Sequence, residues 1–185
     1  MTATEKGLDP FARQADMPFW DEKLSDGTAV TIRAIRHEDA ALEREFIERL
    51  SPEARRMRFL AQISEPSEQM IDRLTNLDFS HDMALIAIVK QQGQATEVGV
   101  ARYATGADRT IGECAIAVTD DWQHRGLGTL LMNRLIEVAR ARGLVKLVSM
   151  DDAGNSKMRE LAKDLGFQRT FDPENPHEVE HSLVL

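Results

Sequence analysis

The sequence contains very little of several residue types, and each shortage excludes a class of protein. Its 185 residues include one cysteine and one tyrosine. The single cysteine, Cys114, excludes an internal disulfide and is typical of a reducing compartment. No stretch approaches the roughly 20 apolar residues that a membrane span needs, and the N-terminus lacks the apolar core of a secretory signal. We therefore expect a cytoplasmic protein without a membrane partner.

Positive charge is scarce as well. Lys and Arg number 23 against 31 Asp and Glu, which gives a net charge of −8. A protein that binds nucleic acid regardless of sequence needs a surplus of Lys and Arg, so we expect no nucleic-acid partner. The negative balance is compatible with a cationic substrate, either an amine or a lysine-rich protein. The histidines have no metal-ligand spacing, and there is no Cys/His cluster, so we expect no metal.

The length of the chain predicts one folded domain. Residues 1–24 carry Gly7, Pro10 and Pro18 among mixed charges and predict a flexible N-terminal leader. Residues 25–185 then form the domain. The leader could dock on the domain through its aromatic residues, which are Phe11, Phe19 and Trp20.

Apolar periodicity divides the domain into strands and helices. The first half reads as a strand near residues 30–34, helices at 37–50 and from Ser51-Pro52, and a short helix at 66–74. Three strand-like runs joined by short polar linkers follow and predict an antiparallel meander, at residues 83–90, 97–104 and 110–118.

The second half begins with a helix whose apolar stripe starts at Leu127 and whose stop signal is Gly143. The strand at 144–150 completes a parallel strand–helix–strand unit. A short helix at 155–166 and closing strands at 167–171 and 179–185 complete the chain, with residues 172–177 expected as a loop.

The stretch DDWQHRGLGTLLM, residues 120–132, joins a strand to the long helix. The first N–H groups of a helix lack internal acceptors and carry partial positive charge, and glycines let a ligand approach them closely. This combination predicts a phosphate site. A Walker A loop would need Gly-Lys-Ser/Thr, and a dinucleotide fingerprint would need a third glycine where Leu131 stands. A glycine-rich turn without a ligand is the alternative.

The six residues Gln123 to Gly128 fit the pattern Gln/Arg-x-x-Gly-x-Gly/Ala, and this pattern resembles the acyl-CoA-binding motif of the GNAT N-acetyltransferase superfamily. The order of elements resembles that superfamily over residues 28–185. The phrases TIRAIRHEDA, RLSPEARRMRF, LTNLDF and VGVARY are similar to the GNAT domain of bacterial protein-lysine acetyltransferases, which stands alone here. The resemblance implies an α/β (α+β) fold. Its mixed, mostly antiparallel central sheet would carry helices on both faces and a parallel βαβ unit at the acyl-CoA site.

The resemblance also implies which residues hold the cofactor. The strand before the loop would run beside the pantetheine arm through Ile116, Ala117 and Val118. Backbone amides would wrap the pyrophosphate, namely those of Gln123, His124, Arg125, Gly126, Leu127, Gly128 and Thr129. The Arg125 side chain either adds charge-assisted contacts or is solvated. Asn155 lies near the cofactor, caps the next helix, or does both.

The implied chemistry is attack of an amine on a thioester. A lysine amine has a pKa near ~10.4, so its neutral form costs about 4.6 kcal/mol at pH 7. Glu113 is the expected proton acceptor, acting through water, and the N–H of Val118 is the expected oxyanion donor. In the relatives the glutamate falls two residues later, where Ala115 stands; Glu113 shares its face of the strand because side chains alternate. The alternative is that Glu113 is an acidic residue at a strand end with no catalytic role.

The sequence thus predicts an N-acetyltransferase that moves an acetyl group from acetyl-CoA, its co-substrate, to a primary amine by direct attack in a ternary complex. A protein lysine is the preferred acceptor because the resemblance extends beyond the cofactor motif. A small amine or polyamine is one alternative, and a non-catalytic acyl-CoA sensor is another. A homodimer remains open. Ala162 stands where many superfamily members place a tyrosine that protonates the leaving thiolate.

Overall fold

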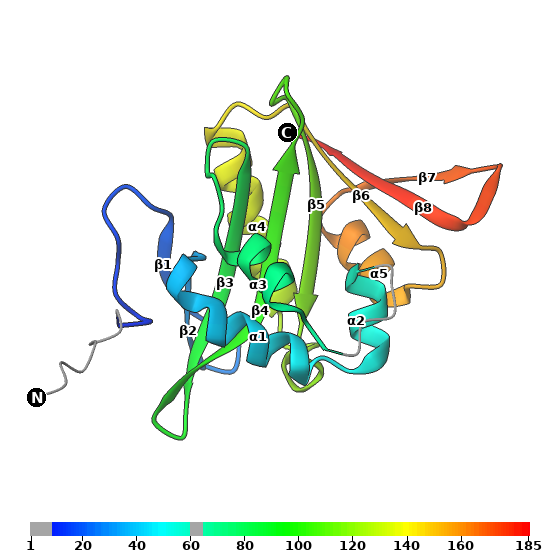
Figure 1. The fold of residues 1–185 in the computed structure, drawn as a ribbon. Helices are drawn as coiled ribbons and strands as arrows, with labels where there is room; N and C mark the ends of the chain where they lie inside the picture. Colours follow the sequence, from blue (N-terminus) through cyan, green and yellow to red (C-terminus); the bar gives the residue numbers. More distant parts are fainter. Residues whose placement is uncertain (1–8, 60–64) are drawn as a thin grey trace, which may run out of the picture.

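The computed structural model describes residues 9–59 and 65–185, and its centre is one sheet of eight strands (Figure 1). The strands lie in the order β1-β2-β3-β4-β5-β6-β8-β7. Their bounds are Phe19–Lys23 (β1), Ala29–Ala34 (β2), Asp82–Gln91 (β3), Gln94–Thr105 (β4), Ile111–Val118 (β5), Lys146–Asp152 (β6), Gln168–Asp172 (β7) and Asn175–Val184 (β8). Neighbouring strands are antiparallel except β5 and β6, which are parallel.

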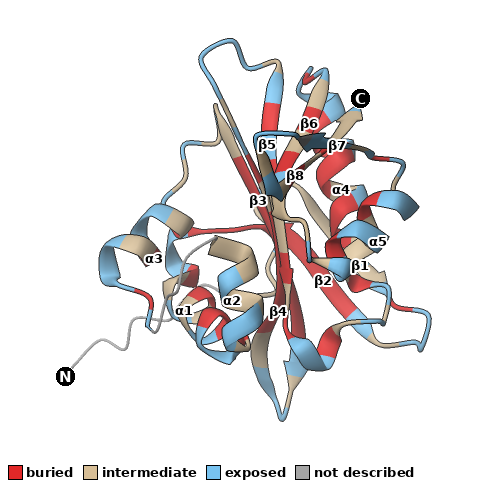
Figure 2. Cartoon of the chain, turned by 90° about the vertical axis from the view of Figure 1, so that its right-hand side faces the viewer, coloured by how far each residue is buried: buried red, intermediate tan, exposed pale blue. Residues whose placement is uncertain are grey.

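Helices cover both faces of the sheet (Figure 2). One face carries α1 (Ala40–Arg49), α2 (Pro52–Phe59) and α3 (Glu68–Thr75), and the other carries α4 (Leu127–Ala141) and α5 (Ser156–Asp164). The predicted α/β class, with a mostly antiparallel sheet and one parallel βαβ unit, is confirmed. Among the described residues, no helix is both long and apolar enough to cross a membrane.

Each face of the sheet buries its own core. The α4 side packs residues such as Leu127, Leu131 and Leu135 against β3, β4 and β6. The α1 side packs Phe46 and Ile47 against the alternate residues of the same strands. Figure 2 shows the buried positions concentrated along the sheet and on the inner sides of the helices.

Part of the expected N-terminal leader belongs to the sheet. Residues 19–23 form β1 and pair with β2, and Leu24 is buried. Further upstream, Arg33 Nε donates to the Pro10 carbonyl at 2.7 Å, and Arg36 Nη1 donates to the Asp9 carbonyl at 3.2 Å. Residues 9–24 are thus tied to the domain, which differs from the expected flexible leader. Residues 1–8 of that leader lie outside the described residues.

The C-terminal hairpin also differs from its sequence prediction. Residues 172–177 were expected as a loop, yet β7 continues to Asp172 and β8 begins at Asn175. Only two residues therefore separate the strands, and the hairpin extends beyond the rest of the sheet (Figure 1).

A buried acid lies between β4 and α1. Glu97 is fully buried, and its carboxyl contacts that of Glu43. Burial, and then the neighbouring Glu43, raise the pKa of Glu97 well above its ordinary value. Arg102 Nη2 lies 3.3 Å from Glu43 Oε1 on the other side of the pair. Glu97 therefore ionises less readily in the folded protein than in the unfolded chain.

Glu97→Gln should change how stability depends on pH. Unfolded Glu97 ionises near pH ~4.3. Because the pKa of Glu97 is raised in the folded protein, the stability that protonated Glu97 contributes is fully present below that pH. This stability is lost as the pH rises toward the folded pKa, by about 1.4 kcal/mol of unfolding free energy per pH unit. Urea unfolding at pH 5, 6 and 7 should show the variant gaining on the wild type as the pH rises, by at most this amount per unit. The same substitution at the exposed Glu48 should give a constant difference; a constant difference for Glu97→Gln would contradict the prediction.

Candidate functional site

The parallel pairing of β5 with β6 is short, and the two strands then diverge. Only three register pairs join them: Ile111 with Lys146, Gly112 with Leu147 and Glu113 with Val148. Beyond these pairs β5 continues to Val118 and β6 to Asp152 without contact as partners, which opens a fork in the sheet (Figure 1). A cleft of about 670 Å³ occupies the fork and is lined by residues of β5, α2, α5, β6 and the glycine loop.

The fork leaves one edge of β5 without a partner strand. At the far end of β5 the Thr119 N–H donates to the Val98 carbonyl, toward β4. At the near end the Thr110 carbonyl accepts from Val145 N, toward β6, at 2.8 Å. Because backbone groups alternate in direction along a strand, the N–H and C=O groups of Ile116 and Val118 point toward the fork. Ala117 turns its backbone groups to β4 instead, although it also lines the cleft.

One of these backbone groups is already occupied. The Gln123 side chain donates to the Val118 carbonyl at 3.0 Å. Of the two backbone groups of Val118, the N–H is therefore the one left free in the described part of the chain. It is the group expected from the resemblance to be the oxyanion donor.

The glycine loop presents a run of free amides beside this edge. Gln123 N–H donates to the Asp120 carbonyl, and Leu130 N–H donates to the Gly126 carbonyl at 3.0 Å. Between them, in the part of the chain that the structure describes, the N–H groups of residues 124–129 have no acceptor. Gly126 is the N-cap of α4 and has φ +80°, a left-handed conformation that favours glycine. Six consecutive amides at a helix N-terminus make an anion site.

Gly128 keeps the approach to these amides open. A Cβ at this position would lie 3.7 Å from Ile116 Cδ1 and 3.8 Å from Leu161 Cδ2, which are ordinary contacts. The fold would therefore accept a side chain at this position of the cleft wall. Because Gly128 has no side chain, the cleft keeps room for a ligand beside the first turn of α4.

Two residues of the predicted loop contact other parts of the molecule. The Arg125 guanidinium bonds Asp26 Oδ2 at 2.5 Å and lies 4.1 Å above the Trp122 ring. Hydrogen bonds from Thr28 and Arg125 hold the pKa of Asp26 well below its ordinary value. The side chain of Arg125 is thus held at the β1–β2 turn rather than in the cleft. Leu127 is buried in the core, so only its backbone amide is available to a ligand.

Asn155 caps α5 and also lines the cleft. Its Oδ1 accepts from Met158 N at 3.0 Å, which confirms the predicted N-cap. Other predicted residues on the cleft wall are Glu113, Gln123, His124, Gly126 and Thr129. The structure therefore brings the predicted strand, loop and helix residues to one cleft.

Glu113 and Cys114 point to opposite faces of β5. Glu113 is exposed, lines the cleft and shares the α2 face with Ala115 and Ala117. Cys114 is buried on the α4 side. Burial, and then the nearby carboxylate of Asp151, raise the pKa of the Cys114 thiol to about 12. The cysteine therefore stays a neutral thiol, as expected for a small buried group.

Several cleft residues were not found from the sequence. Helix α2 forms one wall with Met57, Arg58 and Phe59. It is held across the fork, because Ser51 N–H donates to Asp120 and Arg56 Nη1 lies 3.0 Å from Asp152 Oδ2. Burial, and then the charge of Arg102, lower the pKa of Arg58 to about 10, so Arg58 remains charged at neutral pH.

Comparison with known proteins gives consistent matches. The Acetyltransferase (GNAT) family matches residues 44–167. Acetyltransferase PA5475 of Pseudomonas aeruginosa is 43% identical over 166 residues, covering 90% of this chain and 89% of the relative. The L-methionine sulfoximine/L-methionine sulfone acetyltransferase of the same organism is 41% identical over 56 residues, 30% of this chain and 33% of the relative. The crystal structure of the GNAT domain of S. lividans PAT has a TM-score of 0.82 and 27% identity, covering 90% of this chain and 97% of that one.

A negative charge placed among the free amides should block binding of coenzyme A without harming the fold. Thr129 lies in the first turn of α4 and lines the cleft. Thr129→Glu stabilises the helix by about 0.3–1 kcal/mol but repels a diphosphate, since two like charges 4 Å apart interact by about 4 kcal/mol near a surface. Calorimetry should give a Kd for coenzyme A at least about tenfold higher than for Thr129→Gln.

The glutamine variant is the matched control, because it has the same shape without the charge. Thermal unfolding should show both variants as stable as the wild type. Equal affinity of the two variants for coenzyme A would remove the amide run from the binding site.

Proposed function

Because the chain belongs to the GNAT family of acetyltransferases, its co-substrate is acetyl-CoA, and we propose that its acceptor is the side-chain amine of a protein lysine. The acetyl group passes to the amine by direct attack while both substrates are bound. The proposal is supported by the charge of the cleft and by the chemistry available in it.

The charge of the cleft favours a cationic acceptor. Five carboxylates line it, namely Glu53, Glu113, Asp151, Glu160 and Asp164. Against them stand the cations Arg58 and Lys157. A cleft lined mainly by one sign of charge concentrates substrates of the opposite sign, and a lysine side chain arrives as an ammonium ion. This surplus of carboxylates is the observation that carries the proposal.

The free amides supply binding and orientation. The N–H groups of residues 124–129 would hold the diphosphate, and the open edge of β5 at Ile116 would pair with the pantetheine arm. The Val118 N–H would then face the thioester oxygen as it gains charge. A donor placed in advance at that oxygen lowers the barrier because it need not reorganise during the reaction.

Glu113 would take the first proton from the acceptor. It stands at the last paired position of β5, where the fork begins, and its side chain reaches the cleft from the α2 face. A carboxylate that accepts a proton through water supplies part of the roughly 4.6 kcal/mol needed to present a neutral lysine amine at pH 7. The Cys114 thiol, buried and with a pKa near 12, is a poor nucleophile, which favours direct attack over an acyl-cysteine route.

A free amino acid is a second candidate acceptor, favoured by Arg58. This half-buried arginine lines the cleft and forms no ion pair within 4 Å among the described residues. It could hold the carboxylate of a small substrate. The partial match to an acetyltransferase of L-methionine sulfoximine is in line with this candidate.

An acceptor panel tests the proposal. The purified protein is incubated with labelled acetyl-CoA and a lysine peptide, the same peptide with arginine in place of lysine, a polyamine, and free amino acids. We expect label on the lysine peptide alone, or with kcat/KM at least about tenfold above the other acceptors. Label confined to polyamines or amino acids would contradict the lysine acceptor. Loss of amino-acid turnover in Arg58→Lys, with coenzyme A binding intact, would then support the second candidate.

Glu113→Gln should slow acetylation most at neutral pH. Loss of a general base costs about 10²-fold in kcat, and affinity for coenzyme A should not change. Above pH 9 the amine loses its proton unaided, so the deficit of the variant should shrink. Rates of lysine-peptide acetylation from pH 7 to 10 measure this, with thermal unfolding as the folding control. A kcat equal to that of the wild type at pH 7 would remove Glu113 from the reaction.

A further inference from the structure

A second carboxylate enters the cleft from the opposite face of the sheet. Asp151 lies on β6, three residues beyond the last pair of the fork, and lines the cleft with 14% of its side chain exposed. Along β6, Ser149 and Asp151 share the face of Leu147, which packs in the core beside α4. Asp151 therefore lies on the α4–α5 side, whereas Glu113 lies on the α2 side.

Two buried groups hold one oxygen of this carboxylate. Ser149 Oγ donates to Asp151 Oδ2 at 2.6 Å, and His181 Nδ1 lies 2.9 Å from the same oxygen. His181 stands directly opposite Ser149 in the pairing of β6 with β8. Oδ1 accepts no hydrogen bond from the described residues and is not buried, so it is the oxygen that is open to the cleft.

The surroundings of His181 fix the direction of its hydrogen bond. The residue is 2% exposed, and its Nε2 is buried without a partner among the described residues. A buried N–H left without an acceptor costs about 1–3 kcal/mol, so the proton of a neutral imidazole belongs on Nδ1. His181 and Ser149 thus both donate to Oδ2, and this fixes Asp151 as an acceptor whose only free lone pairs are on Oδ1.

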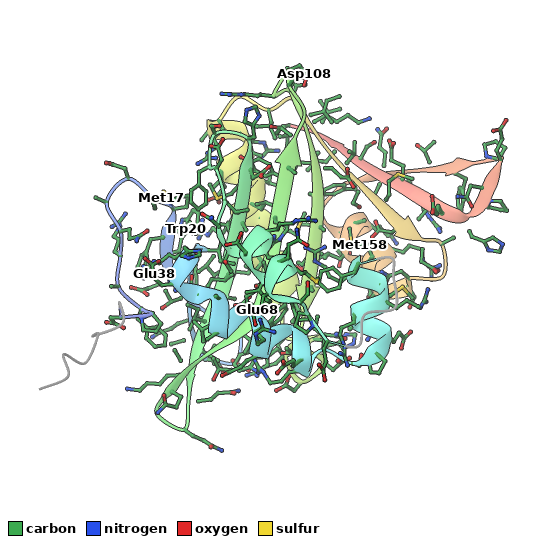
Figure 3. All side chains as sticks on the ribbon, viewed as in Figure 1. Met17, Trp20, Glu38, Glu68, Asp108 and Met158 are labelled. Atoms are coloured by element: carbon green, nitrogen blue, oxygen red, sulfur yellow. The ribbon has the colours of Figure 1, made fainter. Side chains whose placement is uncertain are left out.

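Asp151 faces the strand along which the acyl carrier would lie. Asp151 and Cys114 line the same cleft from the two strands of the fork, and the charge of Asp151 contributes, after burial, to the raised pKa of the Cys114 thiol. Helix α5 also lines the cleft, with the apolar Leu161 and Met158 (the latter labelled in Figure 3) and with polar residues that include Lys157, Glu160 and Asp164. Asp151 is thus an oriented carboxylate on the wall of the cleft.

We propose that Asp151 is a proton shuttle that carries the second proton of the reaction from the attacking nitrogen to the departing sulfur. This inference rests on the proposed transfer of acetyl to an amine. Glu113 removes the first proton of the ammonium ion, on the α2 face, and Asp151 acts on the α4–α5 face. His181 and Ser149 are its positioning residues.

The step balances without any further reactant. The nitrogen lone pair forms the C–N bond, and the carbonyl electron pair moves to oxygen beside the Val118 N–H. The N–H proton then passes to Asp151 Oδ1, the C=O bond reforms, and the C–S bond breaks with its electron pair on sulfur. The sulfur takes the proton from Oδ1, and Asp151 returns to its carboxylate form. One carboxylate can serve both atoms because nitrogen and sulfur are bonded to the same carbon.

Asp151→Asn tests the shuttle, because the amide keeps an oxygen for Ser149 and His181 but accepts no proton. With the amine that the wild type acetylates fastest in the acceptor panel, kcat should fall by about 10²- to 10⁴-fold. The Kd of coenzyme A and the KM of the amine should stay within twofold of the wild type. Because the amine is chosen from the panel, failure of the lysine acceptor and failure of the shuttle give different results.

Two further variants separate proton transfer from structure. Glu180→Gln removes a carboxylate on the neighbouring strand β8, where it pairs with Lys146 and does not line the cleft; its kcat should stay within twofold. His181→Asn keeps a donor near the position of Nδ1 and should retain more kcat than His181→Leu. A kcat within twofold of the wild type in Asp151→Asn overturns the shuttle, as does a loss confined to coenzyme A binding.

Discussion

The site depends on one interrupted interaction, the parallel pairing of β5 and β6 that stops after three residue pairs. A buried backbone group without a partner costs about 1–3 kcal/mol, so an open strand edge persists only where water or a ligand can reach it. The cleft of about 670 Å³ provides that access. The fold thus keeps main-chain donors and acceptors free along β5, and the glycine loop adds six more donors at the mouth of the same opening. This geometry supports the proposal that backbone groups recognise the acyl carrier.

Packing on both sides keeps the fork open. Ile116 of β5 fills the space beneath Gly128 and Leu161, so α4 and α5 rest on the strand without closing over its edge. On the other face α2 is tied at Asp120 and at Asp152, one contact on each side of the cleft. Exposed hydrogen bonds and ion pairs of this kind contribute little to stability. Their role is to position α2, and with it Met57 and Phe59, as a wall of the cleft.

Local sequence patterns predicted the parts of the site that depend on neighbours along the chain. Gly126 and Gly128 at the start of an apolar helix, the cap at Asn155 and the alternation of β5 predicted the loop, the helix and the face of Glu113. Features set by distant residues were missed. Arg125 is held by Asp26, 99 residues earlier in the chain. The short, charged strand β1 pairs with β2, and Arg33 and Arg36 bind the chain upstream of β1. The carboxylate of Asp151 gains its partner His181 only because β6 and β8 pair, which no local pattern predicts.

The side chains of β5 alternate between two faces of the sheet, so one strand places chemically different residues on its two sides. Glu113 and Cys114 are adjacent in sequence, yet one faces α2 and the exposed mouth while the other faces the apolar space beside Asp151. A shift of one residue in register would exchange these faces. It would bury Glu113 beside Asp151, where two carboxylates could not both stay ionised. The pairing of Glu113 with Val148 at the base of the fork prevents this exchange. The register of three residue pairs therefore fixes both where the backbone is free and which acid faces each side of the cleft.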